Sequence, residues 1–93
     1  MRISWDPAKN RRNLTKHGIG FELASFVFTD PLQITRRDPH EHEERWRTIG
    51  VIGGRLILVV HTAFEDKNGE EQIRIISARK ATAAEREIYE NYR

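Results

Sequence analysis

Residues 74–80 read Arg-Ile-Ile-Ser-Ala-Arg-Lys, and this stretch is expected to form the last strand of the fold. Its isoleucines favour a β-strand, because β-branched side chains are stiff and pack well on a pleated surface. A helix is expected to begin directly after it, since Thr82 and Glu85 have the spacing of a capping box. An arginine within such a strand requires an anionic partner, because a buried and unpaired charge is costly. In a small basic protein, phosphate is a candidate for that anion.

The chain before this strand contains four further expected strands and two helices. Asp6 and Pro7 suit a helix start, because aspartate accepts from free backbone N–H groups and proline tolerates the first helical position. Gly18 suits the end of that helix, and Gly53-Gly54 indicates a hairpin turn. The expected strands are residues 2–5, 32–36, 45–52, 55–63 and 72–79, and the expected helices are residues 7–17, 21–28 and 82–92.

This succession of elements predicts one α+β domain over residues 1–93. The order β-α-α-β-β-β-β-α is typical of an antiparallel sheet packed by helices. A chain of 93 residues leaves no room for a second core. The strand at residues 55–63 is apolar on both faces, so we expect it to lie at the centre of the sheet.

The charges are unevenly distributed along the chain. Lys and Arg number 16 against 14 Asp and Glu, which gives a net charge of only +2. Residues 1–18 nevertheless carry five Lys or Arg residues and one acid, whereas residues 38–44 carry four acids and no Lys or Arg. A clustered basic surface favours binding to polyanions, although a mixed and soluble surface explains the same counts.

Composition excludes several classes of site. The chain has no cysteine, which rules out disulfides and thiolate metal sites. No apolar run follows the initial methionine as in a secretory signal, and the longest apolar run, residues 56–60, is too short to cross a membrane. We therefore expect a cytoplasmic protein without a membrane segment.

His40 and His42 form the only metal-like grouping in the sequence, within His40-Glu41-His42. Alternate residues of an extended segment share a face, so the two rings have the spacing of a ligand pair. A tetrahedral or octahedral metal needs further ligands, and no clear third one lies nearby in the sequence. A solvated acidic loop is therefore favoured over a metal site.

Three other positions each allow two interpretations. His61 ends the apolar strand, where it is either a hydrogen-bonded core residue or part of a site at the strand end. His17 follows Lys16 at a helix C-terminus, where it either caps the helix or joins Lys16 in contacting phosphate. Glu44 and Arg45 are either a general base and a phosphate clamp or an ordinary cross-strand ion pair.

Cleavage of RNA without a metal needs only groups of these types. A base removes the proton of the 2′-hydroxyl, cations stabilise the phosphorane, and an acid protonates the leaving 5′-oxygen. No P-loop or dinucleotide motif is present, and Ser77 lacks a nucleophile elbow, so no cofactor is expected. The candidates for proton transfer are Glu44, His61 and His17, and the candidate cations are Arg45, Arg74, Arg79, Lys80 and Lys16.

In combination and in order, these residues resemble the BrnT family of toxins of type II toxin–antitoxin modules. The matching pieces cover nearly the whole chain, and the pairing of Lys-His-Gly with Arg-Ile-Ile-Ser-Ala-Arg is specific, whereas each piece alone is weak. The pieces are Trp5-Asp6-Pro7-Ala8-Lys9, Asn13-Leu14-x-Lys16-His17-Gly18, Phe21-Glu22-x-Ala24, Phe28-x-Asp30-Pro31, Glu44-Arg45, Ile49-Gly50, Val60-His61-Thr62 and residues 74–81.

The resemblance implies a small RelE-like ribonuclease fold that cleaves mRNA and thereby arrests translation. It further implies neutralisation by a BrnA-type antitoxin, and promoter DNA binding by the complex through the antitoxin. Carried over by position, it points to one functional set. That set is Lys16, His17, Glu44, Arg45, His61, Arg74 and Arg79.

Two alternatives to a metal-independent endoribonuclease remain at this point. One is a non-catalytic RNA-binding or regulatory module, and the other is an inactive protein that has kept only its antitoxin surface. Titratable groups accompany the cations, which favours catalysis.

A geometric condition also applies to the last strand, because Arg74 and Arg79 are five residues apart and point to opposite faces of a regular strand. A bulge or the strand end must redirect one of them if both serve one site.

Overall fold

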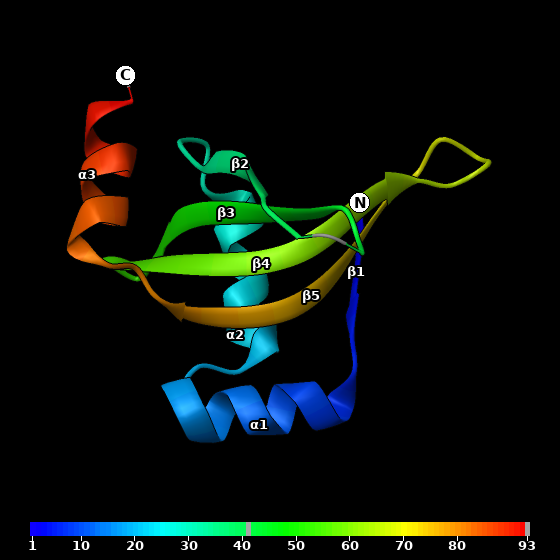
Figure 1. Cartoon of the computed structure of the whole chain (residues 1–93), viewed down its shortest axis with the longest axis horizontal. Coiled ribbons are helices and arrows are strands. Elements are labelled where there is room, and N and C mark those ends of the chain that lie inside the picture. The colour runs from blue at the N-terminus through cyan, green and yellow to red at the C-terminus, as the bar shows by residue number, and fades with distance from the viewer. Residues whose placement is uncertain (41, 93) are drawn as a thin grey trace.

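The structure, a computed structural model, describes residues 1–40 and 42–92 of the chain. Its described part contains a five-stranded sheet in the order β1-β5-β4-β3-β2, with helices around it (Figure 1). None of the described helices has both the length and the apolar character needed to span a bilayer. The strands are β1 (Arg2–Trp5), β2 (Ile34–Asp38), β3 (Arg45–Ile52), β4 (Arg55–Glu65) and β5 (Glu71–Lys80), and the helices are α1 (Pro7–His17), α2 (Phe21–Ala24), the 3-10 helix η1 (Ser25–Thr29) and α3 (Ala83–Asn91).

The expected α+β class is confirmed, but the sheet is mixed. β1 runs parallel to β5 and pairs Ser4 with Arg74, whereas the other neighbouring strands pair antiparallel. The expectation of an antiparallel sheet is therefore wrong at this edge. Parallel partners need a long connection between them, and here the chain from α1 to β4 supplies it.

The helix expected over residues 21–28 forms as two pieces. Residues Phe21–Ala24 are α-helical, and Ser25–Thr29 continue as a 3-10 helix. The hydroxyls of Ser25 and Thr29 donate to the carbonyls three residues earlier, at 2.6 and 2.7 Å. These side-chain bonds accompany the tighter winding of η1, which ends at Thr29 and is followed by the extended Asp30 and by Pro31.

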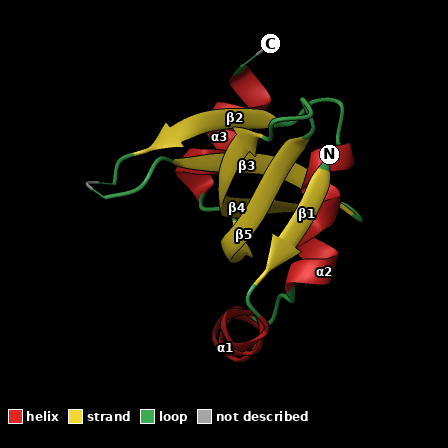
Figure 2. Ribbon diagram, turned by 90° about the vertical axis from the view of Figure 1, so that its right-hand side faces the viewer, coloured by secondary structure: helices red, strands yellow, loops and turns green. Residues whose placement is uncertain are grey.

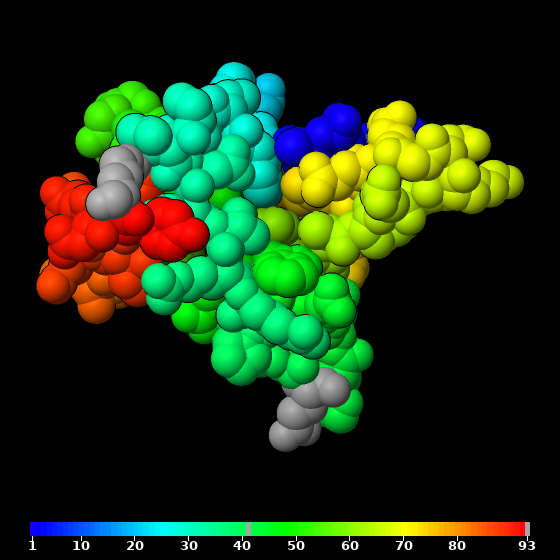
Figure 3. Space-filling view, turned by 90° about the horizontal axis from the view of Figure 1, so that it is seen from above, coloured from blue at the N-terminus to red at the C-terminus, as the bar shows by residue number. Residues whose placement is uncertain are grey.

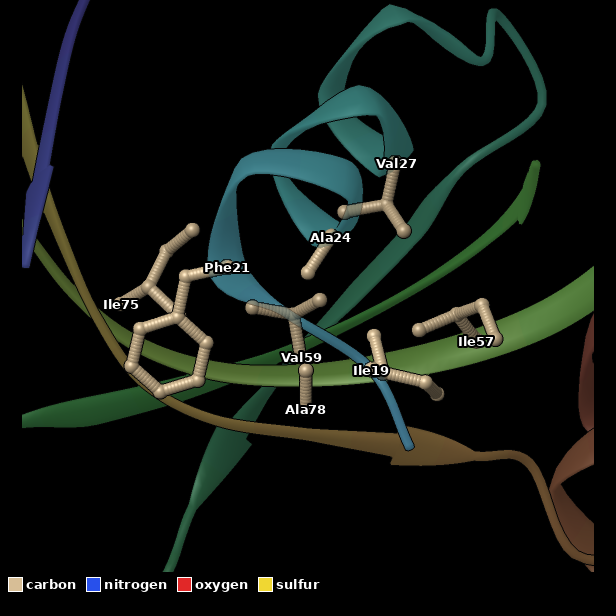
Figure 4. Close-up of a cluster of buried hydrophobic side chains, with 8 residues drawn as sticks. All are labelled: Ile19, Phe21, Ala24, Val27, Ile57, Val59, Ile75 and Ala78. Carbon is tan, nitrogen blue, oxygen red and sulfur yellow. The ribbon is translucent and has the colours of Figure 1, made fainter. Parts of the chain in front are cut away.

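One face of the sheet, here called the α2 face, carries the larger core. Side chains of α2 and η1 pack on β4 and β5, as Figure 4 shows. Gly50 of β3 allows this close packing, because a Cβ at that position would lie 2.9 Å from the carbonyl oxygen of Val27. The buried side chains of this core are Ile19, Phe21, Ala24, Val27, Ile57, Val59, Ile75 and Ala78.

The opposite face, here called the α3 face, is covered only at one end. α3 starts with the expected capping box of Thr82 and Glu85 and buries Tyr89 against the sheet. Figure 2 shows α2 and α3 on different sides of the strands. The side chains of this second core are Ile34, Ile49, Leu56, Leu58 and Tyr89. The rest of the α3 face carries polar and charged side chains, with the exposed Phe64 among them.

Asn13 holds α1 beside the second half of β5. β1 pairs only with residues 72–75 of β5, so the backbone beyond has no strand on that side. The buried Asn13 amide takes the place of a strand: its Nδ2 donates to the Ala78 carbonyl at 2.8 Å, and its Oδ1 accepts from the Ala78 N–H at 3.1 Å. Nδ2 also donates to the carbonyl of Ile19 at 2.8 Å. The end of α1, with its basic residues, is thereby fixed next to β5.

Candidate functional site

A β-bulge in β5 brings Arg74 and Arg79 to the same face of the sheet. Val60 pairs with Ser77 but His61 pairs with Ile75, so Ile76 has no partner in β4. The extra residue reverses the alternation of side chains between the two arginines. Arg74 lies opposite Thr62 and Arg79 opposite Leu58, both on the α3 face. The condition set by the five-residue spacing is therefore met by a bulge.

Two neighbouring strands add arginines to that face. Arg47 of β3 pairs across with Arg36 of β2, and Arg45 lies two residues before Arg47. Cross-strand partners and alternate residues share a face, so all three lie on the side of Arg74. Beyond the end that α3 covers, the α3 face carries an arginine cluster, defined here as Arg36, Arg45, Arg47 and Arg74.

Glu43 lies between two of these arginines. Its Oε2 accepts from Nε of Arg45 at 3.1 Å, and its Oε1 accepts from Nη2 of Arg74. The hydrogen bond from Arg45 is the main cause that holds the pKa of Glu43 below its ordinary value, and the charge of Arg74 adds to it. The Glu43 carboxylate thus connects β5 with the loop that precedes β3.

Glu44, which the sequence suggested as a base, lies elsewhere. Its side chain is 58% exposed and approaches Arg37 at 3.9 Å, a loose surface ion pair. Asp38, at the end of β2, is mostly buried and pairs with Arg47 of the arginine cluster. The three described acids of the 38–44 stretch thus contact four different arginines.

A small hollow opens beside Glu43 and Arg74. Its volume is about 290 Å³, at the lower end of the range for small-molecule pockets. It contains a carboxylate, a guanidinium, two hydroxyls, an amide and an exposed aromatic ring. The lining residues are Ser4, Glu43, Thr62, Phe64, Gln72, Ile73 and Arg74.

Arg79 shares this face but is occupied by α3. Both of its terminal nitrogens donate to the carboxylate of Glu85, each at 2.8 Å. These hydrogen bonds are the main cause that raises the pKa of Arg79 and lowers that of Glu85. The capping box of α3 uses the same carboxylate, since Oε1 of Glu85 accepts from the N–H of Thr82 at 2.9 Å. Arg79 therefore anchors the start of α3 to β5.

His61 lies on the α2 face, away from the arginine cluster. It is 2% exposed, and its ring approaches the carbonyl of Thr62 at 3.0 Å through Nδ1 and the hydroxyl of Thr48 at 2.7 Å through Nε2. A carbonyl only accepts, so we assign the ring proton to Nδ1, which leaves Nε2 to accept from Thr48. Burial is the main cause that lowers the pKa of His61. A second hollow, of about 330 Å³, borders this neutral ring together with Phe28 and Trp46.

Lys16 and His17 lie at the C-terminal end of α1, where Gly18 takes a left-handed conformation that ends the helix. They border a hollow of about 380 Å³ between α1 and β5. The basic side chains that line this hollow are Lys9, Arg12 and Lys16, and within the described residues they form no ion pair with a carboxylate. The hollow is lined by Lys9, Arg12, Asn13, Lys16, His17, Ile76 and Ser77.

The exposed Lys80 pairs with Ile57 in the sheet and so belongs to the α2 face.

The rings of His40 and His42 lie 6.1 Å apart, centroid to centroid. Across residues 1–40 and 42–92, no three His, Asp or Glu side chains gather closely enough to hold a metal ion. Glu41 of the metal-like triplet lies outside the described residues.

The structure therefore unites part of the expected set and separates the rest. Arg45, Arg74 and Arg79 share a face, whereas His61 and Lys80 belong to the other face and Lys16 and His17 flank the sheet. Glu43 and Arg47 were not singled out in the sequence, because neighbouring acids in a loop and alternate arginines in a strand look equivalent until the pairing of β2, β3 and β5 is known.

A comparison with protein families identifies the family of this chain. The family model described as the ribonuclease toxin BrnT of type II toxin–antitoxin systems matches residues 5–85. No curated protein matches the chain.

Proposed function

Because the chain belongs to the BrnT family of ribonuclease toxins of type II toxin–antitoxin systems, we propose that it is an endoribonuclease that cleaves mRNA without a metal ion. The single observation that carries this proposal is the Glu43 carboxylate held between Arg45 and Arg74 on the uncovered part of the α3 face. Two guanidinium groups that converge on one carboxylate present the geometry that also suits a phosphate.

In the proposed reaction, the scissile phosphate replaces Glu43 as the partner of Arg45 and Arg74. Loss of those hydrogen bonds raises the pKa of Glu43 towards its ordinary value, which makes it a better base. Glu43 then takes the proton of the 2′-hydroxyl, and the 2′-oxygen attacks the adjacent phosphorus. The bond to the 5′-oxygen breaks, a 2′,3′-cyclic phosphate forms, and the leaving oxygen takes a proton from solvent. The arginines neutralise the charge of the phosphorane.

The other candidate residues take supporting roles in this proposal. Lys16 and His17 bind a neighbouring phosphate in the hollow between α1 and β5, and Lys80 adds positive charge nearby. Arg79 positions α3, and the neutral His61 supports the sheet beneath the site. In this proposal Glu43 takes the role of base in place of Glu44, whose exposed side chain lies 3.9 Å from Arg37.

The wider biology follows from the family. We propose a RelE-like domain that acts in the cytoplasm, where mRNA cleavage arrests translation. A BrnA-type antitoxin neutralises it and supplies the promoter DNA contact of the complex. The arginine cluster supports such masking, because an acidic segment of the antitoxin is complementary to it in charge.

A second candidate is a non-catalytic RNA-binding module. The lowered pKa of Glu43 favours it, because a carboxylate held by two arginines is a weak base. Such a module binds RNA with a strong dependence on salt and leaves the strand intact.

Cleavage of a defined single-stranded RNA in EDTA separates the two candidates. The proposal expects fragments that end in a 2′,3′-cyclic phosphate, detected by mass spectrometry. Glu43→Gln is expected to lower kcat by about 10²–10⁴-fold, as for loss of a general base. Glu44→Gln is the matched control and is expected to keep full activity. Intact RNA with wild-type protein, or activity lost in Glu44→Gln and kept in Glu43→Gln, contradicts the assignment.

A further inference from the structure

Phe64 is one of several large apolar residues that are exposed in the described part of the chain. It lies one residue before the end of β4, where the β4–β5 hairpin projects from the body of the molecule (Figure 3). Phe64 is 60% exposed and belongs to neither of the two hydrophobic cores that pack on the faces of the sheet. Packing within this chain therefore leaves most of the ring uncovered.

The ring borders the candidate active site. Phe64 pairs with Gln72 of β5 and has the same orientation as Thr62, two residues earlier. It lines the 290 Å³ hollow that also contains Glu43 and Arg74. An exposed aromatic surface is thus combined with a guanidinium and a carboxylate in one small space. Gln72 also lines the hollow. Its Nε2 donates one hydrogen bond to Asp66 at 3.1 Å, and its second N–H and its amide oxygen can serve a base.

This combination matches the way in which proteins bind unpaired nucleotides. Single-stranded RNA is held by cations on its phosphates and by aromatic side chains on which its bases stack. When Arg74 binds a phosphate, the base of the same nucleotide lies within one nucleotide length of Arg74, and Phe64 lines the same hollow.

We propose that Phe64 is a stacking platform for the nucleobase next to the phosphate bound by Arg45 and Arg74. Gln72, its cross-strand partner, contacts the edge of the same base. The inference rests on the proposed ribonuclease function and deepens it. Phe64 and Gln72, beside the β4–β5 turn, then determine part of the affinity for RNA and the preference for particular bases. The ligand is an unpaired nucleotide, and the ring contributes to binding it and not to proton transfer.

The variants for the test are Phe64→Leu, which keeps an apolar side chain without a π-face, and Phe64→Trp, which keeps the stacking surface. Phe26→Leu is the matched control, because Phe26 is 53% exposed on η1 and outside this hollow. Phe64→Leu is expected to raise KM by about tenfold with kcat within about twofold, in line with loss of one base–aromatic contact. Phe64→Trp is expected to restore KM, and Phe26→Leu to leave it unchanged.

A second measurement removes the base instead of the ring. In a short RNA whose residues all carry 2′-O-methyl groups, so that no 2′-hydroxyl can attack, one abasic residue is moved along the strand and Kd is measured. For wild type, the abasic residue is expected to weaken binding about tenfold at one position. For Phe64→Leu, the abasic residue at that position is expected not to weaken binding further, because the loss of the base and the loss of the ring remove the same contact. This uncleaved RNA tests the platform even if the wild type cleaves nothing, so failure of the two proposals is distinguishable.

Two outcomes overturn the inference. An equal abasic penalty in wild type and Phe64→Leu shows that the base does not stack on this ring. Unchanged RNA binding together with weaker antitoxin binding in Phe64→Leu, measured by calorimetry, shows that the ring is a protein contact.

Discussion

Arg79 and Glu85 join β5 to α3 through two parallel hydrogen bonds of 2.8 Å each. The same Glu85 completes the capping box of α3, so one carboxylate serves both the helix start and its attachment to the sheet. Glu85 is largely buried, with a side chain only 13% exposed, whereas Arg79 is 34% exposed. The pair is therefore partly screened by solvent, and its contribution to stability is moderate.

Arg79→Ala is expected to destabilise the fold more than Arg74→Ala does. Loss of a partly screened pair lowers the free energy of unfolding by about 1 kcal/mol, which corresponds to about 4–8 °C in Tm for a domain of this size. Arg74 contacts Glu43 at the surface, and its removal is expected to leave Tm nearly unchanged while cleavage is lost. Thermal denaturation and an RNA cleavage assay measure the two effects. Equal Tm and equal activity of the two variants contradict this division of roles.

Asn13→Leu is expected to be among the most destabilising single substitutions in α1. The change removes three hydrogen bonds and leaves the N–H and C=O of Ala78 and the C=O of Ile19 without their partner. Buried backbone groups without partners cost about 1–3 kcal/mol each, and partial hydration reduces the sum, so we expect a loss of about 3 kcal/mol. Urea denaturation measures it. Leu14→Ala is the control, because Leu14 is 53% exposed, and an equal effect of both changes contradicts the role of Asn13.

His61 is expected to make stability depend on pH in the weakly acidic range. Burial lowers its pKa in the folded state below the ordinary value of 6.5, so the unfolded chain binds the proton more readily. Stability from this group is therefore fully present above pH 6.5 and is lost as pH falls towards the lowered pKa. His61→Gln is expected to lose this part of the pH dependence. Tm is measured from pH 5 to pH 7.5 in both proteins, with the exposed His17→Gln as the control. Parallel curves for wild type and His61→Gln contradict the assignment.

The sequence predicted the elements more completely than it predicted which side chains lie together. Local signals such as the Asp6-Pro7 start, Gly18 and the Thr82–Glu85 capping box act within a few residues, and the structure confirms them. The parallel pairing of β1 depends on contacts with residues seventy positions away, and no local pattern encodes its direction.

The site depends on pairings that a single sequence does not display. Glu43 and Glu44 are neighbours of equal chemistry, and only the fold decides that Glu43 meets both Arg45 and Arg74. The bulge at Ile76 likewise follows from packing, because Ile75 and Ala78 both enter the core on the α2 face. The sequence showed that a bulge or the strand end had to redirect one side chain for Arg74 and Arg79 to share a face, but it did not show which of the two occurs.

The salt dependence of RNA binding provides the last prediction. Each phosphate contact on a single strand adds about 0.7 to the negative slope of log K against log salt concentration. Arg74→Ala and Lys16→Ala are therefore each expected to reduce the slope by about 0.7, and the double variant by about 1.4. The two side chains line separate hollows, so their effects on binding are expected to add. Fluorescence anisotropy with an uncleavable RNA measures the slopes. Glu44→Gln controls for general charge, because it removes a surface charge outside both hollows. A slope that changes for Arg74→Ala alone confines RNA to the α3 face and excludes the hollow beside α1 from the path of the substrate.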